Sequence, residues 1–192
     1  QIPGFGSIDD DIFEPKPSAQ EDPRLTLTEA PDASAFLRAF VDKPKALVGE
    51  QVTLSIYLYY AGSPRFKIDD PHEPFAKDFF QRQLSPKNSD LGERRVTIQG
   101  TPWMAKLIRK TALFPLKSGP AEISPMTVTV VGKGYHGPGV RGGLMRSSQP
   151  VTVEIVEPPT DGRPNGYVVG DVGVYSLQAS VDPKTVQAGG SV

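Results

Sequence analysis

Residues 52–60 read VTLSIYLYY, and this stretch decides the fold class. Apolar side chains occupy its alternate positions, Val52, Leu54, Ile56, Leu58 and Tyr60. A period of two places these side chains on one face of an extended chain, and β-branched and aromatic residues favour that conformation. The stretch is therefore predicted to be a half-buried β-strand.

Shorter segments of the same kind lie on both sides of this strand. Further strands are predicted at 36–41, 65–68, 94–99, 103–114, 121–123, 126–131 and 151–156. Alternation slips near Leu107 and Ile108, so we expect a β-bulge there. A helical turn is expected only around 76–82, and Phe75, Phe79 and Phe80 are expected to cover an open edge of the core. Short strands separated by Gly- and Pro-containing turns predict an all-β protein, an Ig-like antiparallel β-sandwich.

The sandwich is expected to fill only part of the chain. Residues 1–34 are rich in Pro and acidic side chains and have no periodicity, so they are predicted to be a linker. Its isolated apolar residues are expected to be able to contact a neighbouring surface, among them Ile12, Phe13, Leu25 and Leu27. The Ig-like domain is predicted at 35–157, and it includes a Gly-rich loop at 132–148. A second linker is predicted at 158–174.

An internal repeat supports these boundaries. Residues 176–192, SLQASVDPKTVQAGGSV, align without gaps to residues 36–52, FLRAFVDKPKALVGEQV. Residues 175–192 are therefore predicted to be the first strand of a following, truncated Ig-like domain. Because a lone strand cannot bury its apolar face, we expect this strand to be disordered or to pair with a sheet edge of a neighbouring chain. The chain also begins with Gln rather than Met, so it is expected to be a segment of a longer protein.

Composition excludes several classes of function. With no cysteine in 192 residues, the chain has no disulfide, no thiolate nucleophile and no Cys-ligated metal. The formal net charge of −1 gives no overall attraction to nucleic acid or to an anionic membrane. No stretch reaches the length of about 20 apolar residues that a membrane-spanning helix needs.

Three segments carry a resemblance to a known family. Residues 37–60 read LRAFVDKPKALVGEQVTLSIYLYY, residues 105–130 read AKLIRKTALFPLKSGPAEISPMTVTV, and residues 147–192 begin with SSQPVTVEIV. They resemble the second-domain opening, the strand–turn–strand hallmark, and the closing strand and linker of the BatD-like family. The likeness covers roughly residues 35–192, is weak at 61–93, and rests on structural rather than catalytic motifs.

The resemblance implies a bacterial protein anchored in the inner membrane, with several Ig-like domains on the periplasmic side. It implies von Willebrand A-type proteins and a MoxR-type ATPase as partners, because genes for these proteins neighbour those of the family. Membrane contact is expected only through segments outside this chain. The family is named for oxygen tolerance, or aerotolerance, and this name defines no molecular activity.

Few residues suggest catalysis or metal binding. The chain has only two histidines, His72 and His136, and both fall in predicted loops without the partners of a hydrolytic triad. Residues 69–73, DDPHE, offer oxygen and nitrogen donors but lack the glycine and the donor number of a calcium loop. We therefore predict no enzymatic activity, no catalytic residue, no metal and no cofactor.

Basic residues are grouped on the strands predicted at 94–99 and 103–114 and in the Gly-rich loop. The candidates for partner binding are Arg94, Arg95, Lys106, Arg109, Lys133, Tyr135 and Arg141. Such a group is interpreted either as solvated strand faces or as a surface for an acidic partner, where charge sets association rate and specificity. Interleaved aromatic residues for base stacking are largely absent, which argues against nucleic acid. Trp103 is interpreted as a core residue.

The sequence thus predicts a non-enzymatic periplasmic scaffold that binds partner proteins. The alternative is a carbohydrate-binding or adhesion-type β-sandwich, which exposed, coplanar rings of Tyr57 and Tyr59 would favour. A metal-dependent hydrolase is a third hypothesis, and metal analysis of the purified chain distinguishes it from the others.

Overall fold

A computed structural model describes residues 23–32, 34–61, 66–84, 92–132 and 143–168, together with 172, 176, 178–180 and 185. Within these ranges the regular structure is β-strand, apart from one short 3-10 helix, Pro23–Leu25. The predicted all-β class is therefore confirmed. In this described part of the chain, the first strand begins at Ala35 and the last one ends at Val156.

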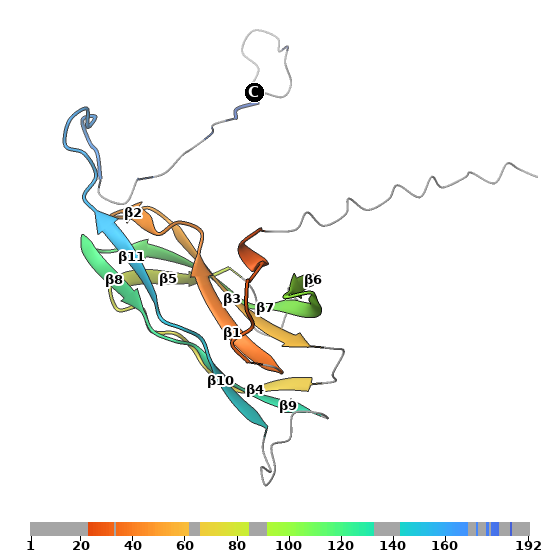
Figure 1. Cartoon of the computed structure of the whole chain (residues 1–192). Helices are drawn as coiled ribbons and strands as arrows, with labels where there is room; N and C mark the ends of the chain where they lie inside the picture. The colour runs from red at the N-terminus through yellow and green to blue at the C-terminus, as the bar shows by residue number, and fades with distance from the viewer. Residues whose placement is uncertain are drawn as a thin grey trace, which may run out of the picture.

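One sheet, termed the large sheet, organises the fold (Figure 1). It contains β1 (Ala35–Val41), β3 (Val52–Ala61), β5 (Phe79–Gln83), β6 (Glu93–Ile98) and β7 (Thr101–Pro115). All its pairings are antiparallel, and β5 and β6 share the edge of β7 that β3 does not occupy. The VTLSIYLYY stretch forms β3, between β1 and β7.

Two small sheets face the large sheet and cover one of its sides, termed the inner face. One contains β2 (Lys45–Leu47), β8 (Gly119–Ile123) and β11 (Val151–Val156). The other contains β4 (Phe66–His72), β9 (Thr127–Gly132) and β10 (Leu144–Ser147). All pairs are antiparallel except β2 with β11.

The inner core lies between these layers and draws on all three sheets. The alternation in β3 places Leu54, Ile56 and Leu58 in it, each at most 2% exposed. The small sheets contribute Ala46, Ala121, Ile123, Val128, Val130, Val153 and Ile155. Burying one such aliphatic side chain contributes about 1.5–3 kcal/mol, so this layer dominates the stability of the fold.

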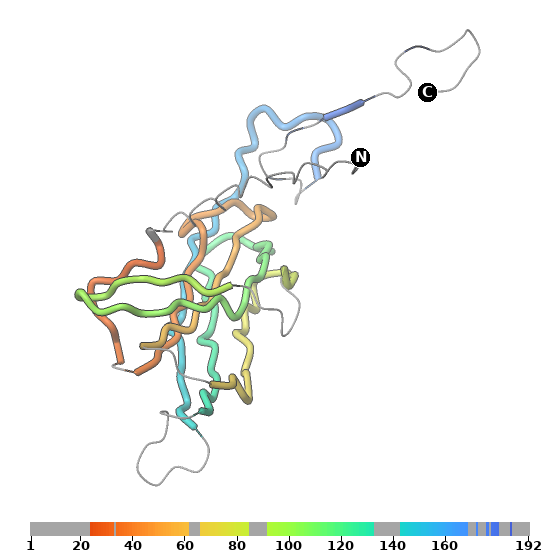
Figure 2. Tube along the Cα trace, turned by 90° about the vertical axis from the view of Figure 1, so that its right-hand side faces the viewer, coloured from red at the N-terminus to blue at the C-terminus, as the bar shows by residue number. Residues whose placement is uncertain are grey.

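The described residues cover only part of the opposite side of the large sheet, termed the outer face. Residues 23–32 and the β6–β7 hairpin enclose a second cluster there, termed the outer cluster: Leu25, Phe36, Tyr59, Ile98, Trp103 and Ala105. Figure 2 shows the hairpin crossing β1 and β3 toward residues 23–32. The Tyr59 hydroxyl donates a hydrogen bond to the Leu25 carbonyl at 3.0 Å, which ties the N-terminal segment to the sheet.

The β6–β7 hairpin owes its geometry to its turn. Gln99 and Gly100 both have positive φ, 49° and 74°. Two adjacent residues of this kind match a type I′ turn, whose twist suits the strands of a hairpin. The turn aligns Ile98 with Thr101, and pairing continues to Glu93 and Lys106.

A β-bulge divides β7, as the slipped alternation predicts. Ile56 pairs with Arg109 and Tyr57 with Leu107, so Ile108 is the additional residue. The side chains of Ile108 and Arg109 therefore both lie on the inner side. Every later residue of β7 points to the opposite face from the one that it would have in a strand without the bulge. This change decides where the charged residues of β7 lie.

Several local predictions are wrong. Residues 79–83 form β5 rather than part of a helical turn, because they pair with β7. Phe79 is buried as expected, but Phe75 and Phe80 are 66% and 60% exposed. Part of the predicted Gly-rich loop is strand β10, which pairs with β9. The predicted strand exchange of 175–192 lies mainly outside the described residues.

Candidate functional site

The predicted basic residues of β7 do not form one surface. Lys106 pairs with Leu58 across the sheet and Arg109 pairs with Ile56, so both lie on the inner side. Lys110 pairs with Ser55 and lies on the outer side. Without the bulge, Lys106 and Lys110 would share a face, since residues four apart in a strand point the same way.

The inner-side residues bind neighbouring carboxylates. Lys106 Nζ lies 3.1 Å from Glu93 Oε1. Arg109 Nε donates to both carboxylate oxygens of Glu73, at 2.7 and 2.8 Å, and its Nη2 also contacts this carboxylate. The Arg109 side chain is only 15% exposed, so this bidentate pair stabilises the β4–β5 connection rather than presenting charge to a partner.

Strand β6 divides its two arginines between the faces. Arg94 pairs with Ala105 of the outer cluster, whereas Arg95 pairs with Met104, which packs against the inner core. Both arginines are exposed. Lys133, Tyr135 and Arg141 lie outside the described residues. Trp103 is 4% exposed in the outer cluster, in agreement with its interpretation as a core residue.

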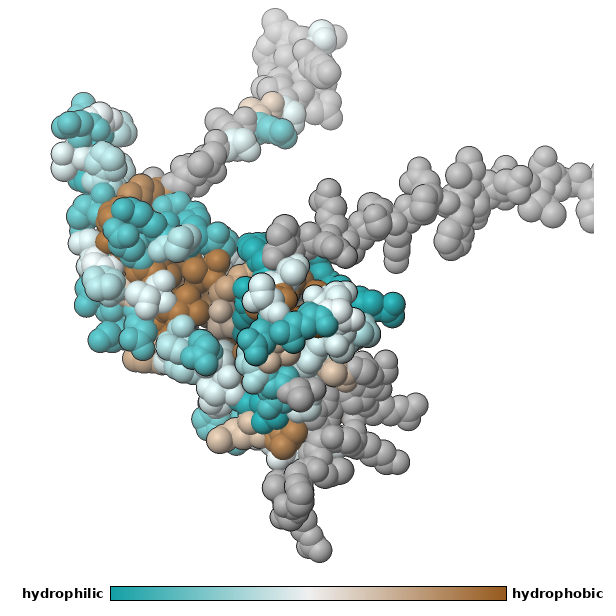
Figure 3. Space-filling model, in the orientation of Figure 1, coloured by the Kyte–Doolittle hydropathy of each residue, from teal (hydrophilic) through white to brown (hydrophobic). Residues whose placement is uncertain are grey.

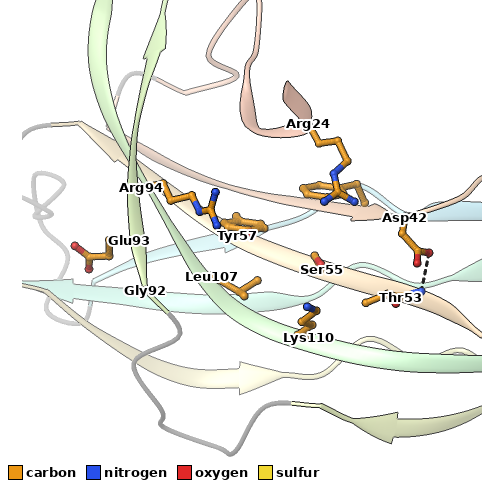
Figure 4. Close-up of a pocket in the computed structure, with 11 residues that line it drawn as sticks. Arg24, Asp42, Thr53, Ser55, Tyr57, Gly92, Glu93, Arg94, Leu107 and Lys110 are labelled. Atoms are coloured by element: carbon orange, nitrogen blue, oxygen red, sulfur yellow. Dashed lines mark hydrogen bonds between the residues drawn. The ribbon is translucent and has the colours of Figure 1, made fainter. Parts of the chain in front are cut away.

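A groove crosses the part of the outer face that residues 23–32 leave open. It has a volume of about 500 Å³ and is lined from β1, β3, β6, β7 and the 3-10 helix. Its cationic side chains are Arg24, Arg94 and Lys110. Figure 4 shows Arg94 extending toward Tyr57 from β6 and Lys110 rising from β7. We term this cavity the outer groove.

An aromatic pair forms one wall of the outer groove. The rings of Phe40 and Tyr57 stack with centroids 5.7 Å apart and an interplanar angle of 5°. The guanidinium carbons of Arg24 and Arg38 lie 5.6 and 5.4 Å from the centroid of Phe40. These cation–π contacts hold positive charge beside an apolar surface.

The acidic residues at the outer groove have bonds within the chain. Asp42 Oδ1 accepts a hydrogen bond from the Thr53 amide at 2.8 Å, at the start of β3. Glu93 pairs with Lys106 on the other side of the sheet, and Figure 4 shows its carboxylate directed away from Tyr57. Three cationic and two acidic side chains thus line the outer groove.

A second aromatic pair lies on the same face, farther along β7. Phe80 and Phe114 are opposite each other in the β5–β7 ladder, with centroids 6.2 Å apart. Phe80 is 60% exposed, and Leu116, which follows on the chain, is 63% exposed. Arg82 lies beside them on β5, opposite Ala112. We term Phe80, which is exposed, and Phe114, which is partly buried, the exposed aromatic pair.

Hydrophilic and apolar side chains gather over different elements. Figure 3 shows apolar residues between β1 and β11, where the edges of the two layers meet, and hydrophilic residues over β6. The partly buried side chains of Ala39 and Val41 on β1 pack against the inner core. Apolar side chains that pack against the inner core therefore reach the surface on the β1–β11 side.

Tyr57 and Tyr59 do not form the exposed coplanar platform that would favour carbohydrate binding. Tyr59 is fully buried in the outer cluster, and its ring stacks on Phe36 with a centroid distance of 4.8 Å. The planes of Tyr57 and Tyr59 are inclined by 56°. Tyr57 contributes instead to the wall of the outer groove.

Residues 69–73 also differ from a metal site. The His72 ring nitrogen Nδ1 lies 3.2 Å from the carbonyl oxygen of Asp70, and Glu73 is bound by Arg109. Among the described residues, no three His, Asp or Glu side chains come close enough to hold a metal ion. In the same ranges, no helix has the length and apolar character required to cross a bilayer.

Comparisons with known proteins add no identification. No protein-family model, no curated protein and no solved structure matches this chain. The features of the molecule that bear on function are the outer groove, the exposed aromatic pair and the charges around them.

Proposed function

We propose that this chain is a non-enzymatic, protein-binding segment of a BatD-like protein anchored at the periplasmic face of a bacterial inner membrane. Its Ig-like domain would serve as a scaffold for von Willebrand A-type partners and the associated MoxR-type ATPase system. The link to oxygen tolerance would then be indirect, through the assembly that the scaffold holds together.

The outer face of the large sheet carries this proposal. One part of that face is closed by residues 23–32, whereas the adjoining part combines a basic groove with exposed aromatic residues. Interfaces between proteins are enriched in aromatic residues and arginine, and exposed apolar groups rimmed by polar ones mark such sites. Complementary charge on a partner would raise the association rate.

A direct binding measurement tests the proposal. The purified chain is immobilised and titrated with a purified von Willebrand A-type domain from the same organism by surface plasmon resonance. Saturable binding that weakens as salt rises is expected, since exposed charges are screened at high ionic strength. Absence of binding at low salt, together with failure of the full-length protein to co-purify with these partners after gentle extraction, would refute the scaffold function.

A further inference from the structure

We infer that the chain forms a symmetric dimer, in which the edge of β1 that faces away from β3 pairs antiparallel with the same edge of β1 in a second copy. We term this side of β1 the open edge. The two large sheets would join into one sheet through main-chain hydrogen bonds, as when an extended strand adds to an exposed sheet edge. This inference is independent of the proposed partner proteins, because it concerns a different surface of the domain.

Main-chain direction shows which residues form the open edge. Among the described residues, β1 pairs only with β3 and so ends the large sheet. At the two ends of this pairing, the Asp42 amide donates to the Thr53 carbonyl at 3.0 Å and the Ala61 amide donates to the Ser34 carbonyl at 3.1 Å. Even-numbered residues of β1 therefore bond to β3. Because main-chain groups alternate in direction along a strand, the amides and carbonyls of the odd-numbered residues point away from β3.

Two of the odd-numbered residues are accessible to a second strand. The Ala35 carbonyl accepts a hydrogen bond from Arg146 Nε at 2.6 Å, and Leu37 is only 5% exposed. Ala39 and Val41 are partly exposed, and their side chains pack against the inner core. Within the described ranges, no main-chain group bonds to these two residues on the side away from β3. Their amides and carbonyls thus lie beside the apolar surface that Figure 3 shows between β1 and β11.

Other sheet edges of the described structure have features that hinder pairing. β4 and β8 each contain a proline, Pro71 and Pro120, and β2 and β10 have only three and four residues. β6 begins with three charged residues, and β5 ends with three polar ones. Proline, charge and short length protect edge strands against pairing with another chain. β1 has seven residues without a proline, and six of them are apolar, so it is the edge best suited to pairing.

The accessible residues define the register of the pair. If Ala39 lies opposite Val41 of the second copy, every accessible main-chain group is used and the two-fold axis passes at Phe40. Directly opposed residues of this kind exchange two hydrogen bonds, so the dimer gains about four. The same register puts Arg38 opposite Asp42 of the second copy, which keeps like charges from facing each other across the pair. A contact between two identical edges is complete with two copies.

Sedimentation equilibrium of the full chain tests the inference. The weight-average mass should rise with concentration from that of one chain to that of two and no further, because each copy offers this edge once. A mass that stays at one chain up to about 1 mM, where even millimolar affinity populates a dimer, would overturn the inference.

Proline substitutions provide matched variants at two sheet edges. Ala39→Pro removes an amide that points away from β3, so the fold should persist while dimerisation weakens by at least about tenfold. Gln83→Pro makes the same change on β5, where the Leu84 amide bonds to the Lys110 carbonyl and the Gln83 amide therefore points away from β7. Gln83→Pro should leave dimerisation unchanged. Circular dichroism and Trp103 emission report on folding.

A lysine at the open edge is the second variant, in case Ala39→Pro does not fold. Ala39→Lys introduces a residue that natural edge strands use against pairing, and it should also weaken dimerisation by at least about tenfold. A dimer that a folded Ala39→Pro or Ala39→Lys variant retains at full strength would overturn the inference.

Disulfide trapping tests the register, since the chain has no cysteine of its own. Phe40→Cys places two cysteines opposite each other with Cα atoms about 4.5 Å apart, within the range of a disulfide. Arg38→Cys, on the same face of β1, leaves its cysteines about 13 Å apart along the strand. Phe40→Cys should therefore crosslink at least about tenfold faster under mild oxidation. Equal rates, or faster crosslinking of Arg38→Cys, would contradict the pairing.

Residues 175–192 are the alternative source of association, because the sequence predicts that this segment can pair with a sheet edge. Leu177→Asp places a charge in the segment and should leave the dimer unchanged. A dimer that is lost in Leu177→Asp and kept in Ala39→Pro would assign association to residues 175–192 and overturn the inference. Dimerisation of a chain that does not bind a von Willebrand A-type domain would reject the scaffold function alone.

Discussion

The same strands form the two faces of the large sheet, but different elements pack against each face. The inner face is covered by two small sheets, and its aliphatic side chains form one continuous core. Among the described residues, only residues 23–32 and the β6–β7 hairpin cover the outer face, where they enclose the outer cluster. Beyond these covering elements, the outer face carries arginine, lysine and exposed phenylalanine side chains. The inner face therefore maintains the fold, and the open part of the outer face is the surface that we propose for partner binding.

The bulge at Ile108 links the two faces. It places Arg109 on the inner side, where Glu73 neutralises it, and moves Lys110 to the outer side, where it lines the outer groove. A single additional residue in β7 thus places two adjacent cations on opposite faces of the large sheet.

The largest effect is expected from a cavity in the inner core. Leu58 is fully buried on β3. Leu58→Ala should lower the free energy of unfolding by about 2–5 kcal/mol, through lost burial and the cavity left behind. Urea denaturation followed by circular dichroism measures it, and a loss below about 1 kcal/mol would show that the inner face is loosely packed.

A smaller effect is expected on the outer face. Leu25→Ala should lower the free energy of unfolding by about 2 kcal/mol, since residues 23–32 can reposition around the missing side chain. Trp103, the only tryptophan of the chain, packs in the same outer cluster and reports on it. Its emission should shift to longer wavelength in folded Leu25→Ala and stay unchanged in folded Leu58→Ala. An unshifted spectrum in Leu25→Ala would mean that this segment does not cover the cluster.

Arginines on β6 and β7 should differ in their contribution to stability. Arg109→Ala removes a bidentate pair with Glu73 and should cost about 1 kcal/mol. Arg95→Ala, at an exposed position on β6, should stay within about 0.5 kcal/mol of the parent protein. A double-mutant cycle with Glu73→Ala isolates the pair, and a coupling energy near zero would contradict its structural role.

The smallest effect concerns acid stability at the start of β1. Burial raises the pKa of Asp32, but hydrogen bonds from Ser34 and Ala35 and the charge of Arg146 together hold this pKa below its ordinary value of 3.8. A carboxylate with a lowered folded-state pKa stabilises the fold above its unfolded-state pKa, and this contribution is lost as pH falls through the folded-state value.

Asp32→Asn should therefore lower Tm at neutral pH and have less effect below about pH 4. Arg146→Gln removes one of the partners of Asp32 and should reproduce part of the change. Melting curves across this pH range measure both variants. A Tm difference between Asp32→Asn and the parent protein that grows toward acid pH would contradict the assigned sign.

Much of the fold follows from local pattern. Alternation predicts β3 and β11, because each of these strands buries mainly one face and so needs a period of two. The strands predicted at 94–99 and 103–114 correspond to β6 and β7. Strands β5 and β10 could not be predicted this way, because Phe80 and Met145 are exposed and only pairing with β7 and β9 makes these segments extended. Local sequence contains no information on such partners.

The site was harder to predict than the fold. Counting charges along the sequence finds the basic residues. Their division between the two faces depends on the strand register at the bulge. The slipped alternation predicts this bulge but does not by itself assign a face to each charged residue. Arg24 was placed in a linker, and its position beside Phe40 depends on burial of its neighbour Leu25. The buried state of Tyr59 depends on the same segment.

The most direct test of the outer face as the binding surface is lysine footprinting. Lys106 and Lys110 lie on the same strand, on opposite sides of the bulge. The chain is acetylated with and without a saturating von Willebrand A-type domain, and modification at each lysine is quantified by mass spectrometry. Partner binding should protect Lys110 and leave the modification of Lys106 and of Lys67, on β4, unchanged. Protection of Lys106 with Lys110 still fully reactive would contradict binding through the outer face.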